Sequence, residues 1–238
     1  MRRCLLAVVI LGFVALVQPA NAAEPRVALV IGNSAYAVAP LANPANDARL
    51  MAATLRNLGF EVMERIDADQ KTMKYAIIEF GERLDQAGSD AVGLFFYAGH
   101  GLQVKGENFL VPLNAQIDKE SHVAIEAVSA FWVLGEMEFA SNRVNFVILD
   151  ACRNNPLARS FRSGTRGLAR MDAPRGSLIA YSTGPGDVAA DGAGANSPYT
   201  LALSQAMQTP GIPAEKMFKL ARDRVLEETG GVQTPWEE

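Results

Sequence analysis

Cysteine and histidine are scarce in this sequence, which holds two of each among 238 residues: Cys4, Cys152, His100 and His122. Cys4 lies in an N-terminal segment that we expect to be removed, and one thiol then remains. A single cysteine excludes an internal disulfide, the usual reason for cysteine in an exported protein. Cys152 is therefore a small buried apolar residue, an intermolecular link or a nucleophile.

A membrane-spanning length of apolar sequence is also lacking. Residues 1–22 have a basic start, an apolar stretch over 4–17 and a small-x-small ending at Ala20-Asn21-Ala22. This pattern is typical of a cleaved secretory signal peptide, and the alternative of an uncleaved anchor is weakened by the short run and by Pro19. We expect a bacterial protein exported to the periplasm or secreted, with a domain at 23–238.

An excess of positive charge is absent. The net charge is −4, and removal of residues 1–22 takes away two arginines and no acidic residue, which gives −6. This balance argues against nucleic acid and against an anionic membrane as partners. No internal repeat divides residues 23–238, and about half of the composition is apolar. Such a chain can form one α/β domain with a full core.

Apolar runs alternate with stretches of helical period, which predicts a mostly parallel sheet with helices on both faces. Sites in such sheets lie beyond the carboxyl ends of the strands. The expected strands are 27–31, 61–66, 91–97, 144–149 and 177–181, with a hairpin turn at 105–108; the expected helices are 43–58, 70–85, 130–139, 199–207 and 213–229.

Two reactive side chains follow two of these strands directly. His100 lies in Ala-Gly-His-Gly and Cys152 in Asp-Ala-Cys-Arg, 52 positions apart. A turn histidine and a buried cysteine are the ordinary interpretations, yet both residues come just past a central strand. The pair therefore predicts a cysteine nucleophile with a histidine base.

Other chemistries lack their motifs. The sequence has no Gly-x-Ser-x-Gly elbow, no phosphate loop ending in Gly-Lys-Ser/Thr and no His-Glu-x-x-His zinc motif. His122 has no thiol or second histidine at metal-ligand spacing, and we interpret it as a surface residue. We expect no metal site and no required cofactor. No loop has calcium-binding spacing, and calcium dependence is left open.

The segments 97–101 (Tyr-Ala-Gly-His-Gly) and 150–156 (Asp-Ala-Cys-Arg-Asn-Asn-Pro) resemble the histidine and cysteine motifs of caspase-like peptidases, in particular the prokaryotic metacaspase-like or orthocaspase branch. Residues 26–33, 43–48, 181–183 and 196–200 fit the same family. The resemblance covers nearly all of the chain after residue 22. It implies a three-layer caspase-like sandwich, with a central, mostly parallel sheet of about six strands and helices on both faces.

The resemblance also implies roles for individual residues. Cys152 would attack the scissile carbonyl as thiolate, and His100 would generate the thiolate and protonate the leaving amine. The backbone N–H groups of Cys152 and Gly101 would form the oxyanion hole. The family usually works as a dyad, and we find no third orienting residue in the sequence.

Substrate preference follows from two acidic positions that the resemblance places at the pocket. Asp47 and Asp150 stand where aspartate-specific caspases have other residues, and Ser182 joins them as a substrate-binding position. Two carboxylates would pair with a basic side chain, which predicts cleavage after Arg or Lys. Helix capping for Asp47 and a strand-end turn for Asp150 are the alternatives.

A basic segment follows the cysteine. Residues 153–174 hold five arginines without an apolar period, which predicts an exposed loop. It is either a solvated linker or a self-cleavage segment of a protease that cuts after basic residues. The candidate positions are Arg159, Arg162, Arg166 and Arg170.

A catalytically inactive caspase-like binding or regulatory module is the main alternative function. The presence of both His100 and Cys152 argues against it, because inactive members generally lose one or both. Partners would be peptide or protein substrates, and we expect a monomer. Family members commonly continue past Trp236, so a truncated C-terminus is left open.

Overall fold

A six-stranded sheet forms the centre of the molecule in this computed structural model, which describes residues 24–151 and 167–238. The strand order is β2-β1-β3-β7-β8-β9, and every pairing is parallel except β8 with β9. The expected signal peptide and Cys152, Arg159, Arg162 and Arg166 lie outside the described residues. The strands of this sheet are β1 (Arg26–Gly32), β2 (Glu61–Ile66), β3 (Val92–Ala98), β7 (Val144–Asp150), β8 (Ser177–Tyr181) and β9 (Trp236–Glu237).

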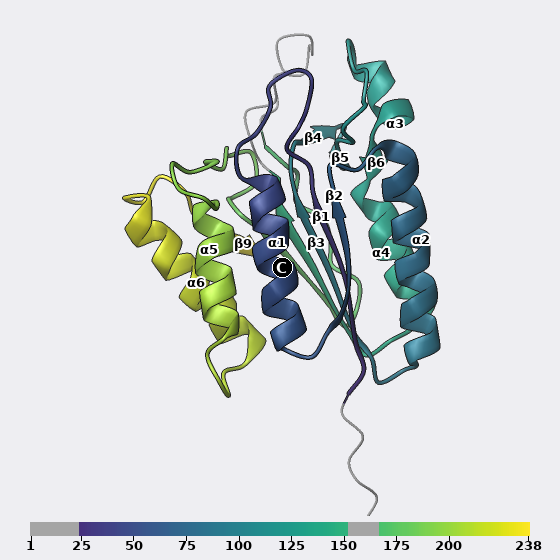
Figure 1. Ribbon diagram of the computed structural model, residues 1–238, viewed down its shortest axis with the longest axis vertical. Helices are drawn as coiled ribbons and strands as arrows, with labels where there is room; N and C mark the ends of the chain where they lie inside the picture. Colours follow the sequence, from purple (N-terminus) through teal and green to yellow (C-terminus); the bar gives the residue numbers. More distant parts are fainter. Residues whose placement is uncertain (1–23, 152–166) are drawn as a thin grey trace, which may run out of the picture.

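Helices cover both faces of the sheet, which makes a three-layer sandwich and confirms the predicted fold (Figure 1). Successive residues of β3 alternate between the two cores: Phe95 and Tyr97 contact one, Leu94 and Phe96 the other. All seven β3 residues are buried, which accounts for their unbroken apolar run. One face carries α1 (Pro44–Asn57), α5 (Pro198–Met207) and α6 (Ala214–Glu228), and the other carries α2 (Gln70–Ala87) and α4 (Ala130–Ala140).

A small antiparallel sheet lies at the carboxyl end of the central strands (Figure 1). It inserts between β3 and α4 and begins one residue after His100. Its first two strands form the expected hairpin, with Lys105 and Gly106 at positive φ in the turn. The elements of this insertion are β4 (Gly101–Val104), β5 (Glu107–Leu110), the 3-10 turn η1 (Glu120–His122), α3 (Val123–Glu126) and β6 (Val128–Ser129).

Local signals explain where the helices begin. The Asp69 carboxylate accepts the Thr72 N–H at 2.7 Å to cap α2, and hydrogen bonds from Thr72 lower the pKa of Asp69. The Ser197 hydroxyl accepts the Thr200 N–H at 3.0 Å, and Pro198 occupies the first turn of α5. Ser-Pro in the sequence thus sets the start of the helix that faces the candidate site.

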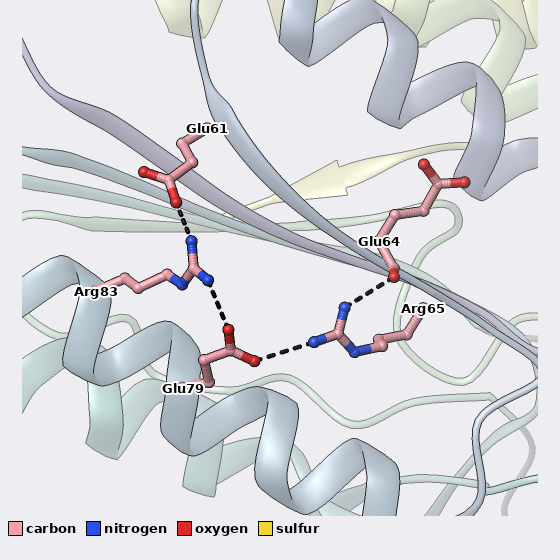
Figure 2. Close-up of polar contacts among 5 residues, drawn as sticks. All are labelled: Glu61, Glu64, Arg65, Glu79 and Arg83. Carbon is pink, nitrogen blue, oxygen red and sulfur yellow. Dashed lines mark hydrogen bonds and ion pairs between the residues drawn. The ribbon is translucent and has the colours of Figure 1, made fainter.

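Ion pairs attach the edge strand β2 to α2 at the outer side of the sheet (Figure 2). Glu79 accepts from Arg83 at 2.7 Å and from Arg65 at 3.0 Å, and Arg83 also pairs with Glu61. The hydrogen bond with Glu79, helped by the charge of Glu61, raises the pKa of Arg83. These groups are partly exposed, so each pair stabilises the fold by less than about 1 kcal/mol.

Residues 167–174, the part of the expected exposed loop 153–174 that the structure describes, form no helix or strand, but the expected exposure is wrong for several of them. Leu168 and Met171 are each 1% exposed and belong to the core under α4. Asn108 of β5 binds both backbone groups of Ala169, donating to its carbonyl and accepting its N–H, each at 2.7 Å. The Met171 N–H donates to the Tyr181 hydroxyl at 3.1 Å. Two apolar residues in a run of arginines have no period, so the sequence did not show their burial.

Within residues 24–151 and 167–238, no helix has the length and the apolar character needed to cross a membrane.

Candidate active site

The register of the central sheet places His100 and the segment that precedes Cys152 at the same edge. β3 and β7 are neighbours, and Ala98 pairs with Asp150. His100 comes two residues after Ala98, and Cys152 comes two residues after Asp150 in the sequence. The ends of the two strands, from which the sequence continues to His100 and to Cys152, therefore lie side by side. The thiol itself lies outside the described residues.

Glycine allows the histidine segment to approach the cysteine segment closely. A Cβ added to Gly101 would lie 2.8 Å from the Ala151 carbonyl oxygen and 3.0 Å from the Ala151 Cβ. Any larger residue would push the two segments apart. The Val111 N–H donates to the His100 carbonyl at 3.0 Å, so in the antiparallel ladder the Gly101 N–H points away from β5.

Two tyrosines fix the backbone of His100. The His100 N–H donates to the Tyr36 hydroxyl at 3.0 Å, and the Tyr97 hydroxyl donates to the His100 carbonyl at 2.9 Å. The Tyr36 ring also packs against the imidazole, with 4.5 Å between ring centroids. His100 is 5% exposed. The imidazole is thus held between the end of β3 and the segment that follows β1.

A backbone carbonyl orients the imidazole ring, a feature that the sequence did not indicate. His100 Nε2 lies 2.7 Å from the Ala39 carbonyl oxygen. A carbonyl oxygen only accepts hydrogen bonds, so Nε2 carries a proton in this contact. In the neutral ring, Nδ1 is then the nitrogen without a proton. Ala39 has a φ of 54°, a conformation that is uncommon for residues other than glycine. Neither Gly nor Asn marks this turn, so no sequence signal existed.

Asp47 and Asp150 meet across the start of α5. Asp47 in the first turn of α1 accepts the Ser197 N–H at 2.9 Å and the Asn196 amide at 3.0 Å. Asp150 at the end of β7 accepts the Ser197 hydroxyl and, at 2.8 Å, the Thr200 hydroxyl. Both carboxylates are fully buried. One serine therefore bridges two acidic residues that are 103 positions apart in the sequence.

The long loop after β8 carries the third predicted substrate-binding residue. Ser182 is fully buried directly after β8, and its hydroxyl has no hydrogen-bond partner among the described residues. Gln233, which is 1% exposed, closes this loop by donating to the Ser182 carbonyl at 2.8 Å and accepting the Ala190 N–H at 3.1 Å. On its other side the loop meets the start of α1, where Asp191 accepts the Ala42 N–H at 2.8 Å.

Arg170 and His122 are the other described residues that the sequence analysis singled out. Arg170 pairs with Glu238 and is exposed at the surface. His122 ends η1 and is half-buried. No cluster of three or more His, Cys, Asp or Glu side chains is placed to hold a metal ion in the described part of the chain. Sequence reasoning missed Ala39, Tyr36, Ser197 and Gln233 as supports of the site.

Comparisons with known proteins agree with this geometry. The sequence matches the caspase-domain family over residues 25–238. It is 33% identical over 132 residues to the human mucosa-associated lymphoid tissue lymphoma translocation protein 1 and equally to its mouse homologue. Each match covers 55% of this chain but 15% of the relative, so the chain spans a small part of those proteins.

The fold has a counterpart among solved structures. The Drosophila initiator caspase Dronc superposes with a TM-score of 0.61 at 12% identity, over 90% of this chain and 78% of that one. This likeness shows the fold. With the family match over all but the first 24 residues, the chain belongs to the caspase-domain peptidase family.

Proposed function

We propose that the chain is a cysteine endopeptidase that cleaves after Arg or Lys with a Cys152–His100 dyad. The observation that carries the proposal is the pairing of Ala98 with Asp150, because these residues end adjacent strands and precede His100 and Cys152 by two positions each in the sequence. The Ala39 carbonyl, which holds the imidazole by Nε2, supports it further.

The reaction follows from this arrangement. His100 Nδ1 takes the thiol proton, and the Cys152 thiolate attacks the scissile carbonyl carbon. The oxyanion is stabilised by the backbone N–H groups of Gly101 and Cys152. His100 then gives its proton to the leaving amine as the C–N bond breaks, and water hydrolyses the thioester with His100 as base. The Ala39 carbonyl stabilises the imidazolium formed on the way. No cofactor enters these steps.

Specificity for a basic residue rests on the buried acidic pair. Asp47 and Asp150 are linked through Ser197, and neutral side-chain and backbone donors hold them in place. A guanidinium or ammonium group that reaches them would gain charge-assisted hydrogen bonds in a site shielded from water. An acidic side chain would meet two like charges there. In addition to this proposed role in specificity, both aspartates stabilise the start of α5 through these hydrogen bonds.

Self-processing and export belong to the same proposal. The anchoring of residues 168–171 by Asn108 and Tyr181 favours cleavage at Arg159, Arg162 or Arg166 over Arg170. The signal-peptide pattern at residues 1–22 supports function outside the cytoplasm.

Reporter peptides test the proposal directly. Peptides that end in Arg, Lys or Asp before a fluorogenic amide are offered to the wild type and to the Cys152→Ala and His100→Ala variants. We expect turnover of the Arg and Lys reporters alone, and its loss in both variants. His122→Ala is the matched control, because His122 is the second histidine of the sequence and does not line the cavity beside His100, and it should keep full activity. Turnover of the Asp reporter, or of none, would contradict the proposal and in the second case favour a binding module.

A further inference from the structure

A cavity of about 330 Å³ opens beside His100. Its walls come from the segment that follows β1 and from the connection between β5 and α3. This size lies at the lower end of the range typical of ligand pockets, about 300–1,000 Å³. The lining residues are Tyr36, Ala37, Val38, His100, Val111, Leu113, Ala115, Gln116, Ile117 and Asp118.

The cavity and the acidic pair lie on opposite sides of His100. Along the carboxyl edge of the sheet the order is β1, β3, β7, so His100 stands between the segment after β1 and Asp150 at the end of β7. The acidic pair also belongs to the face covered by α1 and α5, whereas the β5–α3 connection lies with α2 on the other face, joined by the Leu113 N–H to the Ala68 carbonyl at 3.0 Å (Figure 1).

A peptide that spans both places has its direction set by the chemistry. Under the proposed function, its basic side chain on the acyl side of the scissile bond would contact Asp47 and Asp150. Its leaving amine would lie at the imidazole that protonates it. The peptide would then continue from His100 toward the end of β1, where the cavity begins.

We propose that this cavity is a substrate subsite that takes an apolar side chain from the first or second residue after the scissile bond. The proposal rests on the proposed cleavage after Arg or Lys and extends the substrate description to the leaving side. The substrate class becomes peptides with a basic residue before the cut and an aliphatic or aromatic residue after it.

The character of the walls selects an apolar occupant. Val111, Leu113 and Ile117 line the cavity and have apolar side chains. They belong to one small core cluster or pack against it. Val38 is 67% exposed, although it is a large aliphatic side chain, so a bound apolar group would remove its surface from water. Asp118 is the acidic lining residue, and its charge disfavours an acidic occupant.

Internally quenched peptides test the subsite in wild-type protein. A series keeps Arg before the cut and places Leu, Phe, Gly, Lys or Asp at the first and second positions after it. A fluorogenic Arg reporter that has no residue after the cut runs in parallel as the measure of cleavage after Arg. We expect kcat/KM for Leu to exceed that for Asp by about tenfold or more, from burial of one aliphatic side chain.

Filling the cavity tests its location. Ala115→Phe places a ring in the cavity and should reduce the Leu-over-Asp ratio toward one. Ala124→Phe is the matched control, because Ala124 is exposed on α3 and does not line the cavity, and it should keep the wild-type ratio. Gln116→Trp, at an exposed lining position, replaces Ala115→Phe if thermal melting shows that the latter is unfolded.

Each result decides the proposal. Equal rates across the series, with the Arg reporter cleaved, would overturn the subsite and leave the proposed function standing. An unchanged ratio in a folded cavity-filling variant would overturn the assignment to this cavity. No cleavage of any Arg or Lys substrate would overturn the proposed function and the subsite with it.

Discussion

Removing the charge of Asp150 should weaken selection of a basic residue while the fold is retained. In Asp150→Asn, the Ser197 and Thr200 hydroxyls can keep their bonds by donating to the amide oxygen that replaces Asp150 Oδ2. A charged partner that meets a buried carboxylate loses about 2–5 kcal/mol when that carboxylate is removed. At about 1.4 kcal/mol per tenfold, this corresponds to about 30- to 4,000-fold in kcat/KM. Because Asp47 keeps its charge, we expect the lower end, about 30- to 100-fold.

The assay compares two reporters that differ only in charge, one ending in Arg and one in citrulline. The kcat/KM ratio of Arg over citrulline should fall in Asp150→Asn, mainly through the Arg reporter. Asp172→Asn is the matched control, since Asp172 is an exposed carboxylate beyond the site. Thermal melting verifies folding of both variants. An unchanged ratio in a folded Asp150→Asn protein would refute the pocket role and leave Asp150 as a support of α5.

Three further predictions concern separate parts of the molecule. Ala39→Pro should lower kcat by about 10- to 100-fold, because proline cannot adopt the positive φ with which Ala39 directs its carbonyl at His100, whereas Ala39→Gly should keep kcat. Equal kcat in the two variants would contradict the orienting role of this carbonyl. Arg170→Gln should leave the self-processing fragments unchanged on gels, while joint replacement of Arg159, Arg162 and Arg166 by Gln should remove them. A cut between Arg170 and Met171 would show that the hydrogen bond from Met171 to Tyr181 does not protect this peptide bond. Glu79→Gln should lower the free energy of unfolding by less than about 1 kcal/mol, and this loss should shrink in about 1 M salt, with Glu82→Gln as the control. A loss that does not depend on salt would argue against a contribution of the ion pairs.

The central sheet was predictable because its strands are short apolar runs between helices of clear period. Glu61–Ile66 and Ser177–Tyr181 have the predicted bounds, and the other helices and strands for which the sequence predicts bounds differ by one or two residues at their ends. β6 and β9 have two residues each, too few for any period, and both form through tertiary pairing.

Some residues of the candidate site were predictable from the sequence and others were not. His100 follows a central strand directly, so the sequence pattern pointed to it, whereas Asp47 and Asp150 were reached through the family resemblance. Ala39 acts through its carbonyl, a group that every residue has, and its turn has no glycine to mark it. Ser197 and Gln233 are ordinary polar residues whose roles depend on partners far away in the sequence.

The most direct test of the account is covalent labelling of the thiol. A peptide that ends in an arginyl acyloxymethyl ketone is incubated with the wild type, and the adduct is mapped by mass spectrometry. The account predicts one adduct on Cys152 that requires His100, is blocked by an Arg-terminated substrate peptide, and does not form with the corresponding aspartyl reagent. An unlabelled Cys152 in folded protein, or equal labelling by the two reagents, would contradict it.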